Sequence, residues 1–269
     1  MSTIVGGRRE LRAWATAELA AAGCVSAAAE ADWLLEEAGD DQVGLRAMVA
    51  RRVAGEPLQY VIGWAPFGPL KLRVGPGVFV PRPETETLAD RAAAFLRTRP
   101  SPRVAVDLCT GSGAIACFLA DQAPGTRVLA TELDPGALAW ARPNADAYGV
   151  ELLAGDLDGP LPPELAGRVD VLCANVPYVP TGAIATLPTD VRDHEPRLSL
   201  DGGPDGLDVL RRLVARAGHW LAPGGRLCCE IGEDQAEAAA ALLRAAGLAE
   251  VAVHQDLVGR DRIVEGTRR

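Results

Sequence analysis

The chain has 269 residues, of which 48% are hydrophobic and 23% are charged, and its formal net charge is −9. These proportions are those of a folded globular protein, and the length allows one large domain or a small domain followed by a medium one. The negative charge argues against a protein that holds duplex nucleic acid by neutralising phosphates. No apolar run reaches the roughly 18 residues of a membrane span, and the N-terminus lacks the apolar stretch of a signal peptide. We therefore expect a cytoplasmic protein with no membrane partner.

The chain contains six cysteines and three histidines, and no two cysteines form a Cys-x-x-Cys pair. This spacing predicts that the protein has no zinc or other metal site. Most of the cysteines lie in apolar runs, which favours buried thiols in a reducing compartment.

The N-terminal part of the chain, residues 9–54, is rich in Ala, Leu, Glu and Arg. Leu11, Trp14 and Leu19 fall near one face of a helix, and a second stretch around Trp33 repeats this pattern. The sequence therefore predicts a small helical bundle. We assign residues 1–66 to an N-terminal helical domain.

Between the helical bundle and the rest of the chain, glycines and prolines separate short β-prone segments. This texture predicts a β-hairpin around Phe67–Val74. We treat residues 67–83 as a β-hairpin linker. A helix is expected to follow at 85–96, with Thr85 as its N-cap.

From residue 84 to the end, predicted strands alternate with predicted helices. Such alternation is typical of an α/β fold, in which a mostly parallel, Rossmann-like sheet carries helices on both faces. Two final strands with no helix between them predict an antiparallel finish, and Pro143 should end or kink its helix. The predicted strands are 104–109, 127–133, 151–157, 169–175, 224–232, 250–257 and 260–267, and the helices between them are 113–122, 135–149, 207–221 and 234–247.

Three consecutive predicted strands end in acidic residues, namely Asp107, Glu132 and Asp156, and the first is followed by a turn that contains Gly111 and Gly113. Glycine lets the backbone approach a ligand closely, and ligands of open α/β sheets bind outside the carboxyl ends of the strands. A row of acids there suits a ligand with hydroxyls, an amino group and a positive centre, and S-adenosylmethionine has all three. Taken singly, each acid also fits a helix N-cap or a solvated loop, and the glycine turn also fits simple packing.

The fourth predicted strand is followed by Asn175, Val176, Pro177 and Tyr178. Asn and Pro favour turns, so these residues alone also fit an ordinary turn. They resemble, however, the NPPY motif of the protein-(glutamine-N5) methyltransferases, the HemK/PrmC family that modifies peptide release factors. The resemblance extends from about residue 10 to the end, and its other segments are GEPLQYVIG (55–63), VFVPRPETETL (78–88), DLCTGSGAIA (107–116), HEPRLSLDGGPDGL (194–207), EIGEDQ (230–235) and DLVGRDRIVEG (256–266).

The resemblance implies a methyltransferase domain at residues 84–269 that uses S-adenosylmethionine, and N-terminal helices that dock the protein substrate. It implies methylation of the glutamine amide in the Gly-Gly-Gln loop of a release factor. The implied catalytic residues are Asn175, Val176, Pro177 and Tyr178, with the Asn175 side chain and the Val176 carbonyl holding the amide. The implied cofactor-binding residues are Asp107, Cys109, Thr110, Gly111, Ser112, Gly113, Glu132, Asp156, Leu157 and Asn175, and the implied substrate-binding residues are Arg82, Glu84 and Glu195. We expect a monomer.

Two residues depart from the family pattern: Val176 stands where the family usually has Pro, and Cys109 where it usually has Gly. Three alternatives therefore stay open. The first is the same methyl transfer to another target, such as a ribosomal protein glutamine or a small-molecule amide or amine. The second is a nucleic-acid amino methyltransferase, against which the acidic charge argues. The third is a protein that binds S-adenosylmethionine without catalysis.

Overall fold

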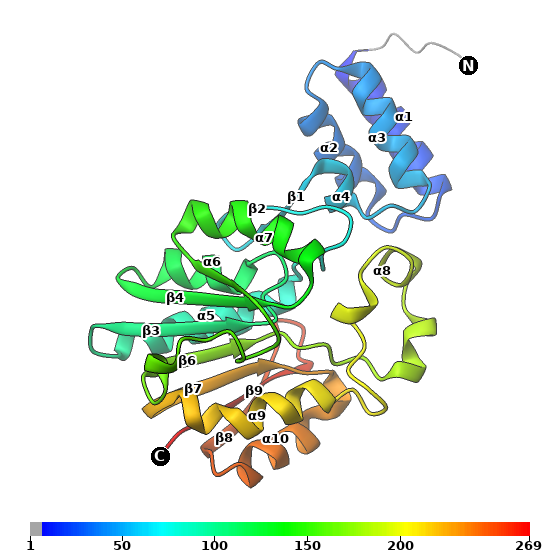
Figure 1. Cartoon of the computed structure of the whole chain (residues 1–269). Coiled ribbons are helices and arrows are strands. Elements are labelled where there is room, and N and C mark those ends of the chain that lie inside the picture. Colours follow the sequence, from blue (N-terminus) through cyan, green and yellow to red (C-terminus); the bar gives the residue numbers. More distant parts are fainter. Residues whose placement is uncertain (1–6) are drawn as a thin grey trace.

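The N-terminal part of the protein is a small group of helices. The computed structural model describes residues 7–269, so the first six residues of the predicted domain 1–66 lie outside the described residues. Within the predicted helical face, Leu11, Ala15 and Leu19 are buried, and Trp33 stacks on Trp64 with ring centroids 5.4 Å apart. Figure 1 shows these helices at one end of the molecule. They are α1 (Arg8–Ala21), α2 (Ala27–Ala38), α3 (Gln42–Val53) and the short α4 (Leu58–Ile62).

A hairpin and a long helix connect this group to the main sheet. Strands β1 (Trp64–Phe67) and β2 (Leu70–Arg73) pair antiparallel, so the predicted hairpin is present but begins earlier than expected. Helix α5 (Pro83–Thr98) also begins earlier, because Pro83 suits the first turn of a helix, and Arg82 is its N-cap. The prediction of Thr85 as the N-cap is therefore wrong, and this buried side chain has another role described below.

The main sheet has seven strands in the order β5-β4-β3-β6-β7-β9-β8. The first five of these strands run parallel, and β9 is antiparallel to both of its neighbours, which confirms the predicted antiparallel finish. The strands are β3 (Arg103–Leu108), β4 (Thr126–Glu132), β5 (Glu151–Ala154), β6 (Val169–Ala174), β7 (Leu221–Glu230), β8 (Ala249–Gln255) and β9 (Asp261–Thr267). The helices between them are α6 (Ala114–Gln122), α7 (Pro135–Tyr148), α9 (Asp208–Trp220) and α10 (Ala236–Ala245), with 3₁₀ turns η1 (Pro163–Leu165) and η4 (Glu233–Gln235).

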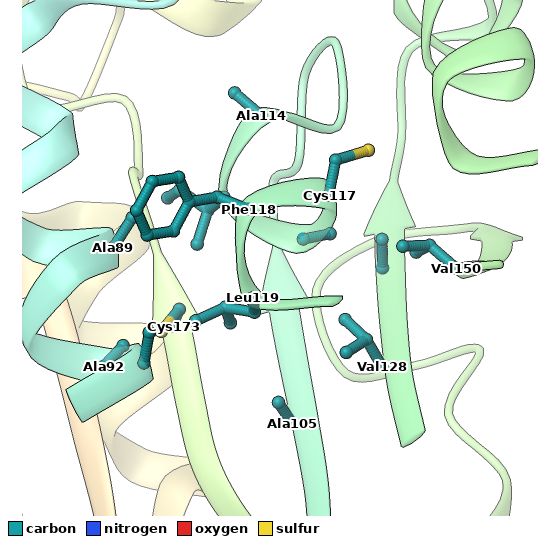
Figure 2. Packing of buried hydrophobic residues seen from close by; sticks show 14 of the residues in the cluster. Ala89, Ala92, Ala105, Ala114, Cys117, Phe118, Leu119, Val128, Val150 and Cys173 are labelled. Carbon is teal, nitrogen blue, oxygen red and sulfur yellow. The ribbon is translucent and has the colours of Figure 1, made fainter. Parts of the chain in front are cut away.

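Both faces of the sheet are covered by helices, as the predicted Rossmann-like α/β fold requires. Neighbouring residues of one strand point to opposite faces, and the chain follows this rule with Cys228 in one hydrophobic cluster and Cys229 in the other. Figure 2 shows the first cluster, where Phe118 of α6 lies beside Ala89 of α5 and Leu119 extends toward Cys173 of β6. The second cluster brings α9 and α10 onto the other face.

Helix α7 continues past Pro143, so of the two expected outcomes, an end or a kink, the helix does not end there. Side chains on either side of this proline anchor the helix to its surroundings. The Trp140 indole donates to the Pro76 carbonyl at 3.1 Å, and the Asn144 amide donates to the carbonyls of Arg73 and Ser112 at 3.0 and 2.8 Å. These tertiary bonds offset the local cost of the proline.

A long segment between β6 and α9 folds over the carboxyl end of the sheet. It contains only short helical turns, namely η2 (Thr181–Thr186), α8 (Thr189–Arg192) and η3 (Arg197–Ser199). In Figure 1 it lies on the same side of the sheet as the N-terminal helices. We call residues 179–206 the cover loop. Within residues 7–269, no helix is long and apolar enough to cross a bilayer.

Candidate active site

A cavity lies at the carboxyl ends of β3, β4 and β6, where the sequence predicted a ligand site. It contains about 1260 Å³ of empty space, part of which is open to solvent. Ten of the predicted site residues line it: Cys109, Thr110, Gly111, Ser112, Glu132, Asp156, Leu157, Asn175, Pro177 and Tyr178.

The glycine-rich turn forms the floor of this cavity, and Asp107 holds the turn from below. Asp107 is buried, and its carboxylate accepts hydrogen bonds from the Thr110 hydroxyl at 2.5 Å and from the Ala116 backbone at 3.1 Å. Burial raises the pKa of Asp107 to about 7. Asp107 and Gly113 do not reach the cavity surface, in contrast to Gly111. Asp107 thus shapes the turn from within the core.

Cys109 adopts a backbone conformation that explains why glycine is favoured at this position. Its φ angle is 57°, in the left-handed region. A side chain there costs about 1–2 kcal/mol, whereas glycine has no such penalty. The chain tolerates this strain, and the small thiol forms part of the cavity wall.

The Glu132 carboxylate ties the end of β4 to the glycine-rich turn. One oxygen accepts from the backbone N–H groups of Leu133 and Asp134 at 2.8 and 2.9 Å, and the other accepts from Gly111 at 2.8 Å. Burial raises the pKa of Glu132, and these three bonds oppose that rise. A carboxylate has about four acceptor positions, so one position remains for a ligand hydroxyl. Accepting two hydroxyls would require the loss of a backbone bond.

Strand β5 ends at Ala154, earlier than the predicted strand 151–157, and Asp156 and Leu157 line the cavity from the segment that follows it. The Asp156 carboxylate pairs with the Arg212 guanidinium of α9 at 2.5 Å, and both side chains are about half exposed. An exposed pair of this kind contributes little to stability. Asp156 can therefore exchange Arg212 for a ligand group at small cost.

Asn175 and Tyr178 converge on a buried glutamate from β7. The Asn175 amide nitrogen donates to the Thr85 hydroxyl oxygen at 3.2 Å, and the Thr85 hydroxyl donates to Glu230 at 2.5 Å. The Tyr178 hydroxyl donates to the other oxygen of Glu230 at 3.2 Å. Burial raises the pKa of Glu230 to about 7, against the hydrogen bonds from Thr85 and Tyr178 and the positive charge of Arg262. Thr85 and Glu230 were not predicted as site residues. Glu230 could have been, because it is an acidic residue at the end of a strand, like Glu132.

The backbone of the Asn175–Tyr178 segment is held from two sides. The Gln235 side-chain amide donates to the Tyr178 carbonyl at 2.8 Å. A β-carbon added at Gly202 would lie 2.5 Å from the Pro177 carbonyl oxygen, so only glycine allows the cover loop to approach this closely. The segments EIGEDQ and DGGPDGL therefore support the geometry of the segment that follows β6.

Val176 does not line the cavity. Its side chain is 2% exposed and lies in the hydrophobic cluster beneath α9 and α10. A backbone hydrogen bond from Val176 opposes the rise that burial causes in the pKa of the Cys229 thiol. Proline at this position would have no N–H to donate.

Arg82, Glu84 and Glu195 link the walls of the site without lining the cavity. Glu195 of the cover loop accepts from Arg82 at 2.6 Å and from the Val80 backbone at 3.3 Å. Glu84 pairs with Arg260, in the turn between β8 and β9, at 2.7 Å. Contact of these side chains with a substrate stays a prediction. Within residues 7–269, no group of three or more His, Cys, Asp or Glu side chains is arranged to bind a metal ion.

Comparison with known proteins gives closely related sequences over nearly the whole chain. The chain is 43% identical over 273 residues to the release factor glutamine methyltransferase of Mycolicibacterium smegmatis, covering 94% of this chain and 95% of the relative. It is 46% identical over 226 residues to the release factor glutamine methyltransferase of Moorella thermoacetica, covering 82% and 78%. The chain belongs to the release factor glutamine methyltransferase family. The predicted family is thus confirmed, although no protein-family model matches the chain.

The fold of this family member also resembles solved methyltransferases. A methyltransferase from Pyrococcus furiosus matches with a TM-score of 0.53 and 21% identity, over 83% of this chain and 97% of that one. At this identity the similarity shows the fold alone. It agrees with the predicted methyltransferase-type α/β sheet.

Proposed function

We propose that the protein transfers a methyl group from S-adenosylmethionine to the side-chain amide nitrogen of a glutamine in a release factor, within its Gly-Gly-Gln loop. One observation carries this proposal: Asn175 and Tyr178 lie in the same cavity as the glycine-rich turn and Glu132. The cofactor side and the amide side of the reaction therefore share one space. The names of the related enzymes support the choice of release factor as the substrate.

The residues of the cavity fit the cofactor. A β-carbon at Gly111 would meet nothing within 4 Å, so this part of the floor is open to a ligand. Glu132 keeps one acceptor position for a ribose hydroxyl, and Asp156 can release Arg212 to accept another polar group. The bound cofactor supplies an electrophilic methyl group on a positively charged sulfur, which a cavity rich in acidic side chains favours.

The residues after β6 act on the amide. A carboxamide nitrogen is a weak nucleophile because its lone pair is delocalised, so the site must orient it firmly. We assign the Asn175 side-chain oxygen as the acceptor for one N–H group and Tyr178 as a surface for the amide plane. We assign the second N–H group to the Val176 carbonyl, because this residue stands between two that line the cavity although its own side chain is buried. Correct orientation can lower the barrier by about 7–11 kcal/mol. Burial raises the pKa of Tyr178, so its hydroxyl stays protonated, and water takes the proton that the methylated amide releases.

The rest of the chain is proposed to bind the substrate protein. In this view residues 1–66 dock the release factor, residues 67–83 form the linker, and residues 84–269 carry out the transfer. A groove that includes Trp33, Arg52, Gln59, Arg82 and Asp190 joins the N-terminal helices to the cover loop. Arg82 and Glu195 would then position this loop for the substrate.

The proposal is tested by incubating the full-length protein with radiolabelled S-adenosylmethionine and purified release factor. We expect labelling of the wild-type release factor and none of a variant whose Gly-Gly-Gln glutamine is replaced by alanine. Asn175→Ala should abolish transfer. Because Asn175 is also among the predicted cofactor-binding residues, calorimetry measures the cofactor Kd of this variant alongside. Cofactor binding without labelling, or equal labelling of the glutamine-free variant, would refute the assignment of the substrate.

A further inference from the structure

We infer that Thr85 and Glu230 are positioning residues that set the direction of the Asn175 carboxamide and of the Tyr178 ring. The inference rests on the proposed function, because it concerns the grip on a substrate amide. Thr85 comes from α5, Glu230 from the end of β7, and Asn175 and Tyr178 from the segment after β6. Three separate parts of the chain thus meet at one carboxylate.

When Glu230 is ionised, the order of donors and acceptors along this network is fixed by chemistry. An ionised carboxylate only accepts hydrogen bonds, whereas a hydroxyl has one proton to donate. Because an ionised Glu230 has no proton to give, the 2.5 Å contact uses the proton of the Thr85 hydroxyl. The Thr85 oxygen, 3.2 Å from the Asn175 side chain, is then left as an acceptor and selects the NH₂ end of that amide.

This selection determines what Asn175 presents to the cavity. The two ends of a carboxamide are similar in shape, so its hydrogen-bond partners decide which way it points. With its NH₂ group held by Thr85, Asn175 directs its oxygen away from Thr85 and can accept an N–H from a substrate amide. A flipped Asn175 would face that substrate with a second NH₂ group, and the grip would be lost.

Glu230 is suited to this role because it is enclosed and faces few competing charges. It is 1% exposed and does not line the cavity, so it does not touch a substrate. The charged groups that act on it are Arg262 of β9, which favours its ionised form, and Glu84 of α5, which opposes it. The Arg262 guanidinium also lies 5.9 Å from the centre of the Tyr178 ring. Glu230 therefore holds both Thr85 and Tyr178 as donors.

The decisive variant is Thr85→Val, which removes the hydroxyl and keeps the shape of the side chain. Thr85→Ser keeps the hydroxyl in place of Thr85. Thr126→Val is a matched control: Thr126 begins β4, at the end away from the site, and its hydroxyl has no hydrogen-bond partner among the described residues. We expect Thr85→Val to lower kcat roughly 10- to 100-fold, as loss of an orienting partner does elsewhere. The Kd of the cofactor should not change. Thr85→Ser should recover most of the kcat.

A second measurement does not depend on the substrate. In ¹⁵N–¹H spectra of the full-length protein, the side-chain NH₂ signal of Asn175 is assigned by its loss in Asn175→Asp. We expect this signal to shift in Thr85→Val and to stay in place in Thr126→Val. An unmoved signal in Thr85→Val, or a kcat equal to that of Thr126→Val, would overturn the inference. If the wild type methylates no release factor, the proposed function fails, and the NH₂ signal still decides whether Thr85 orients Asn175.

Discussion

The buried carboxyl of Glu230 should make the stability of this protein depend on pH in a direction that can be worked out. Burial raises its pKa from the ordinary value of 4.5 to about 7 in the folded state. Between these two values the folded chain holds a proton that the unfolded chain releases. The free energy of unfolding therefore falls as pH rises through this window. Each pKa unit corresponds to about 1.4 kcal/mol, so the contribution reaches about 3 kcal/mol above pH 7.

Glu230→Gln removes this titration and isolates its effect. We expect the free energy of unfolding of the variant, relative to wild type, to rise by up to about 3 kcal/mol between pH 4.5 and pH 8. Burial also raises the pKa values of Asp107 and Glu195 to about 7, but both residues are present in the two proteins, so their effects cancel in the difference.

The assay is urea unfolding followed by tryptophan fluorescence at several pH values. Thr126→Val adds no ionisable group and provides a reference whose difference from wild type should not vary with pH. A constant difference between Glu230→Gln and wild type would show that the carboxyl titrates as it does in water. A difference that favours wild type as pH rises would reverse the sign and refute the reasoning.

Three further changes test the rest of the site. Glu132→Gln removes one of the carboxylate oxygens that accept hydrogen bonds from the backbone of residues 111, 133 and 134. Hydrogen bonds to charged groups contribute about 1.5–3 kcal/mol, so the calorimetric Kd of the cofactor should rise by about 10- to 100-fold. An unchanged Kd would argue against a role of Glu132 in cofactor binding. Val176→Pro keeps the backbone carbonyl, and a swap of similar volume usually costs less than about 1.5 kcal/mol of stability. The labelling assay should therefore give a kcat within about threefold of wild type. A larger fall in kcat would show that the Val176 N–H matters for catalysis. Glu195→Gln removes the charge that pairs with Arg82. Protease cleavage in the cover loop should become about tenfold faster, because a loss of about 1.4 kcal/mol of local stability corresponds to a factor of ten. An unaltered cleavage rate would mean that the ion pair does not stabilise this loop.

Much of the fold follows from local sequence patterns. Short apolar runs bounded by turns predict the buried parallel strands, and the two closing strands without a helix predict the antiparallel edge. Acidic residues at successive strand ends predict the position of the cavity, since parallel strands bring their carboxyl ends together. The structure places Glu132 and Asp156 in that cavity and Asp107 beneath it.

The network around Asn175 was not predictable in the same way. Thr85 is separated from Asn175 by 90 residues and from Glu230 by 145, so no local pattern connects them. Thr85 was predicted as an N-cap because it precedes the expected helix 85–96. Helix α5 instead begins at Pro83, which leaves the Thr85 hydroxyl free to donate to Glu230. Pro143 does not end its helix for a related reason, because tertiary bonds from Trp140 and Asn144 outweigh its local preference.

The geometry also explains why Val176 is compatible with the proposed chemistry. The site separates two tasks, since Asn175 and Tyr178 present side chains to the cavity while residue 176 turns its side chain into the core. A residue there needs an apolar side chain and a correctly placed carbonyl, and valine supplies both. Its additional N–H would be a buried donor without a partner next to most apolar neighbours, which costs about 1–3 kcal/mol. The Val176 backbone lies close enough to Cys229 of β7 to oppose the rise that burial causes in the pKa of this thiol, but sulfur is only a weak acceptor. The Cys229 sulfur therefore offsets only part of that cost, and the apolar packing of the Val176 side chain is what makes valine fit this position.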